Sequence, residues 1–207
     1  MIEVFTFDLG NVIIPFDHSS IARRLIQYSK NQWKYSYEDI HKYLYRVAEV
    51  EHQYEEGKIS TDEFINSVVK RFELNISADE FTSIFNDIFF EIDDKMERLI
   101  KRIKDSGYPL ILLSNTNEMH FNYILNRYPL ISIFDEFILS YRVGFRKPDE
   151  RIYRVLLKMA KCNPDEIFYV DDISEYVGAA KNLGIDAHQF TSIDELSNLI
   201  SRLIYQS

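Results

Sequence analysis

The residues whose chemistry stands out in this chain follow four short apolar segments, directly or after a brief loop. They are Asp8, Ser114 with Asn115, Lys147, and Asp171 with Asp172. Clustered carboxylates suit a hard cation such as Mg²⁺, which takes oxygen ligands and retains some of its waters. A hydroxyl, an amide and an ammonium group suit the oxygens of a phosphoryl group. Brought together, these side chains would form a site for a divalent cation and a phosphate ester.

The charges of these side chains also make the cation necessary. A phosphate that approaches Asp8, Asp171 and Asp172 is strongly repelled in a partly buried site. One Mg²⁺ ion and the ammonium of Lys147 offset this repulsion and polarise the phosphorus atom. We therefore expect Mg²⁺ as the cofactor.

The pattern of apolar residues indicates how such distant residues could meet. Strands are predicted at 3–7, 110–113, 136–140, 167–170 and 186–190, with helices between them at about 96–106, 118–126, 149–161 and 175–183. A last helix is predicted behind a capping box formed by Ser192 and Glu195. Strands that alternate with helices form a parallel sheet with right-handed crossovers. Ligands bind beyond the carboxyl ends of such strands, where we expect the polar residues to converge.

Between the first strand and residue 92 the periodicity is helical. Ser60 with Glu63 and Ser77 with Glu80 have the spacing of capping boxes, and apolar residues follow each pair at helical intervals. Because no strand pattern interrupts this segment, it is predicted to be an insertion. The fold class is therefore α/β: a Rossmann-like parallel sheet core flanked by helices, at 1–16 and 93–207, with an inserted α-helical domain at 17–92.

Composition limits the partners that the protein could have. The 207 residues include 24 Lys and Arg against 33 Asp and Glu, a formal net charge of -9, which argues against a nucleic acid or an anionic membrane as partner. No apolar run approaches the length of a membrane span, the N-terminus has no signal-peptide pattern, and the single cysteine, Cys162, suits a reducing compartment. We expect a cytoplasmic protein and leave its oligomeric state open.

Four motifs resemble those of haloacid dehalogenase-like hydrolases and occur in the same order as in that family. They are FDLGNV at 7–12, LLSN at 112–115, GFRKP at 144–148 and YVDD at 169–172. The inserted helical segment stands where the family carries its α-helical cap. The combination looks most like the sugar-phosphate phosphatases of the family, which implies a small phosphorylated metabolite as the substrate.

The resemblance also implies a role for each residue. Asp8 would attack phosphorus and become an aspartyl phosphate, and Lys147 would bridge Asp8 and the phosphate. The hydroxyl of Ser114 and the backbone N–H of Asn115 would hold the phosphoryl oxygens. The metal ligands that the resemblance implies are Asp8, Gly10 through its carbonyl, and Asp172, with Asp171 nearby.

One position departs from the family's pattern. Most phosphatases of the family carry an aspartate two residues after the nucleophile, as general acid and base, and this chain has Gly10 there. General acid–base catalysis typically contributes about 10²–10⁴-fold. One outcome is that another group replaces the acid, for which Asp17 and His18 are candidates, although both could simply be hinge residues. The other is a leaving group that needs little help, as in an anomeric sugar phosphate.

Two further functions fit parts of the sequence. Dehalogenation of 2-haloacids uses the same scaffold, but that reaction needs no metal, and the acidic pair at 171–172 argues against it. A protein that binds Mg²⁺ and a phosphate ester without turnover would account for Gly10. Of the other residues, we expect Glu175 to be a hydrogen-bonding partner of the site and Trp33 to be structural.

Overall fold

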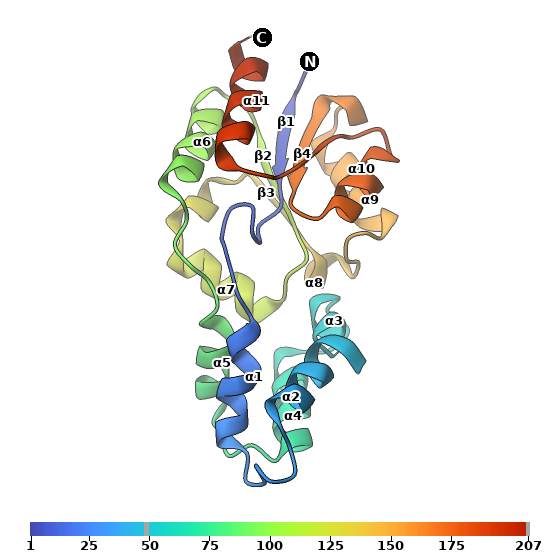
Figure 1. The fold of residues 1–207 in the computed structure, drawn as a ribbon. Coiled ribbons are helices and arrows are strands. Elements are labelled where there is room, and N and C mark those ends of the chain that lie inside the picture. Colours follow the sequence, from blue (N-terminus) through green and yellow to red (C-terminus); the bar gives the residue numbers. More distant parts are fainter. Residues whose placement is uncertain (48–49, 206–207) are drawn as a thin grey trace.

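The computed structural model describes residues 1–47 and 50–205, which form a parallel sheet with helices on both faces and a block of helices beyond one end (Figure 1). The strands are β1 (Val4–Phe7), β2 (Leu110–Ser114), β3 (Glu136–Leu139), β4 (Ile167–Asp171) and β5 (Asp186–Gln189). They lie in the order β3-β2-β1-β4-β5, and every neighbouring pair is parallel. The chain order therefore reverses between β1 and β4, which is where open sheets of this kind bind ligands.

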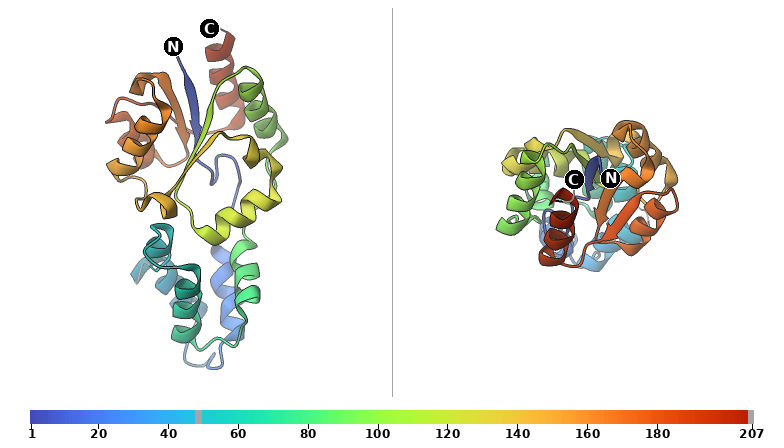
Figure 2. Two further views of the ribbon diagram at one scale, coloured as in Figure 1. Left: turned by 180° about the vertical axis from the view of Figure 1, so that it is seen from behind. Right: turned by 90° about the horizontal axis from the view of Figure 1, so that it is seen from above.

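The helices divide between the sheet and the block. Those of the block are α1 (Ser19–Leu25), α2 (Tyr37–Lys42), α3 (Val50–Glu55), α4 (Thr61–Phe72) and α5 (Ala78–Asn86). Those around the sheet are α6 (Asp94–Asp105), α7 (Glu118–Arg127), α8 (Ser140–Val143), α9 (Glu150–Ala160), α10 (Ser174–Lys181) and α11 (Ile193–Tyr205). Figures 1 and 2 show α6, α7 and α11 on one face of the sheet and α9 and α10 on the other.

Successive strand residues face opposite sides of the sheet. Phe5 and Phe7 pack in one apolar cluster with side chains from α6, α7 and α11, whereas Val4 packs in a second cluster with α9 and α10. Every residue of β1, β2 and β4 is buried. Strands covered on both faces need apolar residues at nearly every position, which explains the continuous apolar runs in the sequence.

The helices α1 to α5, called the helical block here, bury an apolar cluster of their own at the carboxyl end of the sheet (Figure 1). Both predicted capping boxes are present. The hydroxyls of Ser60 and Ser77 accept the backbone N–H groups of Glu63 and Glu80, and each glutamate carboxylate accepts the N–H of its serine. These bonds satisfy N–H groups that have no partner within α4 and α5.

The helical block approaches the sheet region closely at the turn between α3 and α4. Gly57 in this turn has a φ of +65°, and a Cβ on it would lie 2.2 Å from the carbonyl oxygen of Tyr141 in α8. Nearby, the hydroxyl of Tyr54 accepts the backbone N–H of Met119 in α7 at 3.0 Å. The absence of a side chain in this turn therefore allows α3 and α4 to sit directly against α7 and α8.

Some local expectations are wrong in detail. Ser140 begins α8 instead of ending a strand. The Ser192 hydroxyl accepts the N–H of Glu195 at 3.3 Å, as predicted, but the Glu195 carboxylate accepts from the Thr191 hydroxyl instead of completing a capping box. Thr191 lies only four residues before Glu195, so its hydroxyl competes for the carboxylate that the box requires.

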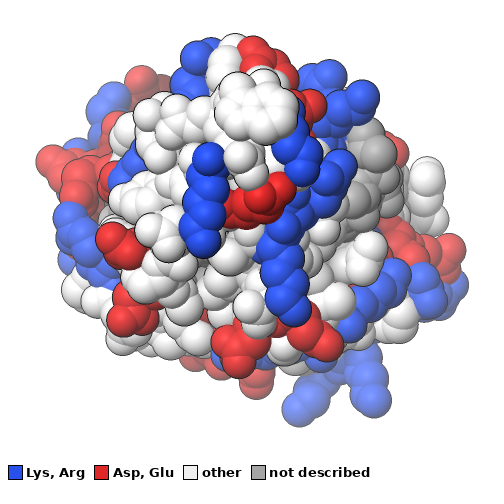
Figure 3. All heavy atoms as spheres, turned by 90° about the horizontal axis from the view of Figure 1, so that it is seen from below, with Lys and Arg blue, Asp and Glu red and all other residues white. Residues whose placement is uncertain are grey.

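Trp33 is not a core residue, because its side chain is 85% exposed in the loop between α1 and α2. This loop lies at the end of the helical block farthest from the sheet (Figure 1). Figure 3 views the molecule from that end, where Lys and Arg side chains lie among acidic ones.

Within the described residues, no helix has the length and apolar character that a membrane crossing requires.

Candidate active site

Asp8 lies at the carboxyl edge of the sheet, directly after β1. Its backbone N–H continues the strand ladder by donating to the carbonyl of Val170 at 2.9 Å. The chain then turns sharply, because the N–H groups of Ile13 and Ile14 both donate to the carbonyl of Leu9. Asp8, only 7% exposed, is therefore fixed at the centre of the sheet edge.

Lys147 lies between two carboxylates and is almost completely buried. Its Nζ donates to Asp8 Oδ1 and to Asp171 Oδ2, at 2.6 Å each, and to the carbonyl of Leu113 at 3.2 Å. An ammonium group has three N–H donors, so all of them have protein acceptors. The contact with Asp8 agrees with the prediction. The other two N–H groups of the ammonium donate to Asp171 and to the carbonyl of Leu113.

The side chain of Asn115 holds the loop that carries Lys147. Lys147 N–H donates to Asn115 Oδ1 at 2.7 Å, and Asn115 Nδ2 donates back to the Lys147 carbonyl at 2.9 Å. What Asn115 can offer a ligand is therefore its backbone N–H. The hydroxyl of Ser114, at the end of β2, donates to the Asn115 carbonyl at 3.3 Å, a long bond that a phosphoryl oxygen could replace.

The two acidic residues after β4 differ in how they are engaged. Asp171 is fully buried, and its Oδ2 accepts from Lys147 and from the Tyr169 hydroxyl, while its Oδ1 accepts a backbone N–H of the next turn. Asp172 is half-buried. Asp8, Asp171 and Asp172 each place one oxygen within 4.8 Å of the others. Asp171 thus orients Lys147, and Asp8 and Asp172 are the freer donors for a cation.

The site carries more negative than positive charge. Burial raises the pKa of Asp8 to about 7, because the attraction of Lys147 offsets it only in part and the charge of Asp171 adds to it. Burial and the charge of Asp171 also raise the pKa of Asp172. Burial alone would lower the pKa of Lys147, but Asp8 and Asp171 outweigh it and hold that pKa above its ordinary value. A divalent cation among the carboxylates would favour their ionised forms.

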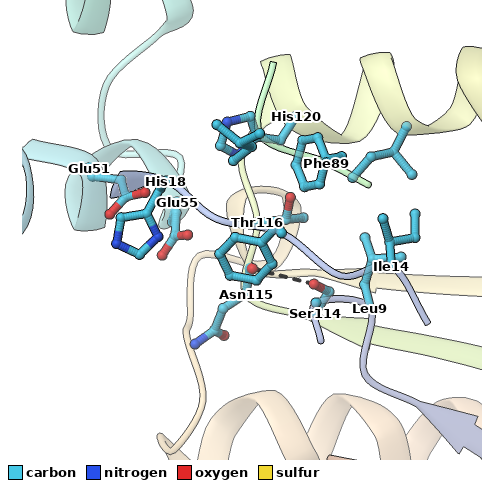
Figure 4. A pocket seen from close by; sticks show the side chains of 14 residues that line it. Leu9, Ile14, His18, Glu51, Glu55, Phe89, Ser114, Asn115, Thr116 and His120 are labelled. Carbon is cyan, nitrogen blue, oxygen red and sulfur yellow. Dashed lines mark hydrogen bonds between the residues drawn. The ribbon is translucent and has the colours of Figure 1, made fainter. Parts of the chain in front are cut away.

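Gly10 leaves no space for a side chain. A Cβ at this position would lie 2.7 Å from Cε1 of Phe16, whose ring occupies the volume beside the strand-one loop. Gly10 and Phe16 line a cavity of about 200 Å³ together with Ser114 and Asn115 (Figure 4). The cavity therefore opens directly onto the groups that are expected to hold a phosphate.

The cavity has a second polar wall that the sequence motifs do not indicate. Glu51 and Glu55 of α3 line it, together with His18 (Figure 4). The Nε of Arg146 donates to Glu55 Oε2 at 2.6 Å, and so joins the loop of Lys147 to the helical block. The only signal in the sequence is the spacing of the two glutamates, because residues four apart share one face of a helix.

Two other expected residues lie away from the cavity. The carboxylate of Asp17 is exposed and accepts the backbone N–H and the hydroxyl of Ser19, at 2.8 and 2.9 Å. Glu175, expected to be a hydrogen-bonding partner of the site, is exposed at the start of α10 and bonds none of the described site residues. Of the candidates for the missing acid, His18 is the one that lines the cavity.

The chain is similar to known proteins over most of its length. The model of the haloacid dehalogenase-like hydrolase family matches residues 2–184. D-ribitol-5-phosphate phosphatase of Bacteroides thetaiotaomicron is 27% identical over 195 residues, which are 91% of this chain and 92% of that protein. Sesquiterpene phosphatase astK of Aspergillus oryzae is 26% identical over 140 residues, which are 67% of this chain and 70% of that protein.

A solved structure of a haloacid dehalogenase family enzyme from Bacteroides thetaiotaomicron has the same fold, with a TM-score of 0.84 at 22% identity, over 96% of this chain and 98% of that one. A structure of that enzyme in complex with magnesium and inorganic phosphate gives a TM-score of 0.80 at 23% identity, over 92% and 95% of the two chains. Because the family model covers most of the sequence, from the first strand to the end of the helix after the acidic pair, this chain belongs to the haloacid dehalogenase-like hydrolases.

Proposed function

We propose that this hydrolase is a Mg²⁺-dependent phosphatase of small phosphorylated metabolites, with sugar phosphates as the preferred class. The observation that carries the proposal is the meeting of four residues at the switch point of the sheet: Asp8, Lys147, Asp171 and Asp172. A buried carboxylate held by an ammonium, beside further carboxylates, suits attack on the phosphorus of a cation-bound ester. The similarity to D-ribitol-5-phosphate phosphatase supports this substrate class.

The residues present fit a magnesium ion. Three carboxylates with oxygens within 4.8 Å of one another form a hard donor set, and their combined charge exceeds that of Lys147. Asp8, Asp172 and the carbonyl of Gly10 would hold the ion, with Asp171 behind them. When bound, the ion supplies Lewis-acid polarisation of the phosphoryl group and neutralises its charge.

The chain's own residues then carry out two displacements at one phosphorus atom. The carboxylate of Asp8 attacks, the ester oxygen departs, and the side chain becomes an aspartyl phosphate. The Ser114 hydroxyl and the Asn115 N–H hold the phosphoryl oxygens during both steps. Lys147 keeps the Asp8 carboxylate oriented. Water then attacks the aspartyl phosphate, which releases inorganic phosphate and restores Asp8.

We assign residues 17–92 as a cap over a core that is formed by 1–16 and 93–207. The ion pair of Arg146 with Glu55 at 2.6 Å and the bond from Met119 to Tyr54 join the two parts beside the cavity. A closed cap excludes water from the reacting group. The cavity of about 200 Å³ restricts the leaving group to a small molecule, since sites for drug-sized ligands span about 300–1,000 Å³.

The test is release of inorganic phosphate from a panel of phosphate esters, with and without Mg²⁺. The panel holds D-ribitol 5-phosphate, α-D-glucose 1-phosphate, nucleoside monophosphates and p-nitrophenyl phosphate. We expect Mg²⁺-dependent turnover that Asp8→Asn abolishes, because an amide cannot act as the nucleophile. Asp17→Asn is the matched control, since its carboxylate is exposed and bonded to Ser19, and it should keep wild-type turnover.

Other outcomes would assign a different function. Wild-type turnover by Asp8→Asn would show that the nucleophile is another group. Release of chloride from a 2-haloacid in the presence of a chelator would identify a dehalogenase. If Mg²⁺ and inorganic phosphate raise the melting temperature but no ester is hydrolysed, the chain is a binding protein.

A further inference from the structure

For an ester whose leaving group needs a proton, the donor has to stand at a position other than Gly10. Gly10 has no side chain, and the Phe16 ring stands 2.7 Å from where its Cβ would be, so position 10 of this chain does not carry the acid. In an in-line displacement the leaving oxygen departs on the side of phosphorus opposite the nucleophile. With Asp8 at the sheet edge, that side faces the helical block, and the acid should stand on the cavity wall that the block contributes.

That wall carries two carboxyl groups on one helix. Glu51 and Glu55 are four residues apart in α3, so their side chains leave the same face of the helix. Figure 4 shows both pointing into the cavity beside His18, on the side opposite Leu9 and Ser114. If the phosphoryl group of an ester is held at Ser114, its leaving group would lie between the phosphoryl site and these carboxyl groups.

The environments of the two glutamates differ. Glu55 accepts from Arg146 at 2.6 Å, in an ion pair whose side chains are 12% and 20% exposed, and a guanidinium at that distance favours the carboxylate. Among the described residues, Glu51 has no ion-pair partner. Burial raises the pKa of Glu51 well above its ordinary value, and the charge of Glu55 adds to this while Arg146 opposes it. Arg146 is thus bound to Glu55, and burial favours the protonated form of Glu51.

The remaining titratable groups around Glu51 do not compete for this role. Burial and the neighbouring His41 lower the pKa of His18, so its ring is neutral at pH 7. The ring of Tyr45 packs against those of His18 and His41, at 4.7 and 5.1 Å between centroids, and its hydroxyl is buried. Burial raises the pKa of Tyr45 far above neutrality. A neutral imidazole and a neutral phenol are much weaker acids than a carboxyl group.

We propose that Glu51 is the catalytic acid and base of this enzyme, presented by the cap in place of a side chain in the loop after Asp8. The inference rests on the proposed phosphatase function. In the first step the bond from phosphorus to the ester oxygen breaks, the bond to Asp8 forms, and the Glu51 proton passes to the leaving oxygen. In the second step water attacks phosphorus, its proton passes to Glu51, and the bond to Asp8 breaks. The cycle leaves Glu51 protonated again.

The test compares esters whose leaving groups differ in their need for a proton. The first is whichever of D-ribitol 5-phosphate and the nucleoside monophosphates the wild-type enzyme hydrolyses faster, because the alcohol of these esters departs as a strongly basic alkoxide unless it receives a proton. The second is p-nitrophenyl phosphate, whose nitrophenolate is stable without a proton. We expect Glu51→Gln to lower kcat for the alkyl ester about 10²-fold or more and to change kcat for the aryl ester less than about threefold.

Glu56→Gln is the matched control, because Glu56 follows Glu55 directly and pairs with Lys58 at 2.6 Å. It should leave both esters unaffected. Glu51→Asp should recover part of the alkyl activity, since it restores a carboxyl group. Retained aryl activity in Glu51→Gln also shows that the variant is folded and that Asp8 still works.

The pH profile gives a second readout. Wild-type kcat for the alkyl ester should fall as the pH rises through the pKa of Glu51, because the acid is then lost, and Glu51→Gln should lack this limb. Two outcomes would overturn the assignment of Glu51 and leave the phosphatase assignment intact. One is an equal loss of kcat for both esters in Glu51→Gln. The other is a wild-type enzyme that hydrolyses aryl esters alone. Failure of the phosphatase assignment would appear separately, as the absence of Mg²⁺-dependent phosphate release from every ester of the panel by the wild-type enzyme.

Discussion

Two adjacent residues, Arg146 and Lys147, serve two carboxylate clusters in different ways. At the strand ends, Lys147 bonds both Asp8 and Asp171 at 2.6 Å. At the helical block, Arg146 bonds Glu55 at 2.6 Å and leaves Glu51 without an ion pair among the described residues. A cation shared by two buried carboxylates offsets part of the cost of burying each charge, whereas a cation bound to one of two carboxyls leaves the other able to hold a proton. The first arrangement suits a nucleophile and the second an acid.

The largest expected effect comes from removing the shared cation. Lys147→Met should lower the free energy of unfolding by about 3–5 kcal/mol without Mg²⁺, since two buried carboxylates lose their partner. The loss should shrink as the pH falls, because the carboxyls then take up protons. Urea unfolding with a chelator present measures both. Lys181→Met, at an exposed position of α10, should change stability by less than about 0.5 kcal/mol; equal effects of the two variants would contradict the shared-cation interpretation.

An intermediate effect is expected at His120, which lies where α7 of the sheet region meets α5 of the cap. Its Nε2 lies 3.1 Å from the Phe85 carbonyl, and its Nδ1 lies 3.1 Å from Nδ2 of Asn117. Only the neutral ring satisfies both partners, as a donor to the carbonyl and an acceptor from the amide. Burial lowers the pKa of His120 to about 4.

Because this folded-state pKa lies below the unfolded value of about 6.5, the stabilisation is complete above pH 6.5 and is lost as the pH falls toward 4. The loss should reach about 3 kcal/mol, because each tenfold change in proton affinity on folding is worth about 1.4 kcal/mol. Unfolding free energies between pH 4.5 and 7 would measure it. In His120→Gln, which keeps a donor and an acceptor, this part of the pH dependence should vanish; an unchanged slope would place the titrating group elsewhere.

The smallest expected effect concerns the cap cluster. Arg146→Met should cost about 2 kcal/mol of stability, less than a fully buried pair because both partners are partly exposed.

Glu55→Gln should shift the alkaline limb of alkyl-ester turnover to lower pH, because removing the like charge lowers the pKa of Glu51. A shift to higher pH would contradict the assignment of the free acid to Glu51.

The sheet and the phosphate-facing residues could be predicted from the sequence, for a local reason. Asp8, Ser114 and Asp171 each follow a buried apolar run, and a parallel sheet brings such ends to one edge. Asp8 and Lys147 are 139 residues apart, and their 2.6 Å contact follows from topology alone. The capping boxes at Ser60 and Ser77 are equally clear, because their partners lie three residues away.

The cap wall could not be predicted in the same way. Glu55 and Arg146 are 91 residues apart, and their contact depends on how the helical block docks, which no local pattern encodes. The size of Trp33 suggests a structural role, but the loop that carries it leaves the side chain in solvent. In the sequence Glu51 resembles any solvated helix residue, and its importance appears only once the cavity beside it is known.

The contact between the helical block and the sheet region depends on the absence of a side chain at Gly57. A Cβ on residue 57 would lie only 2.2 Å from the Tyr141 carbonyl oxygen, so any larger residue would push α3 away from the strand ends. Because Glu51 lies on α3, this displacement would move its carboxyl group away from the cavity and leave Asp8 in place. On the proposed function, an alanine at this turn should therefore lower the turnover of alkyl esters and spare that of esters with good leaving groups.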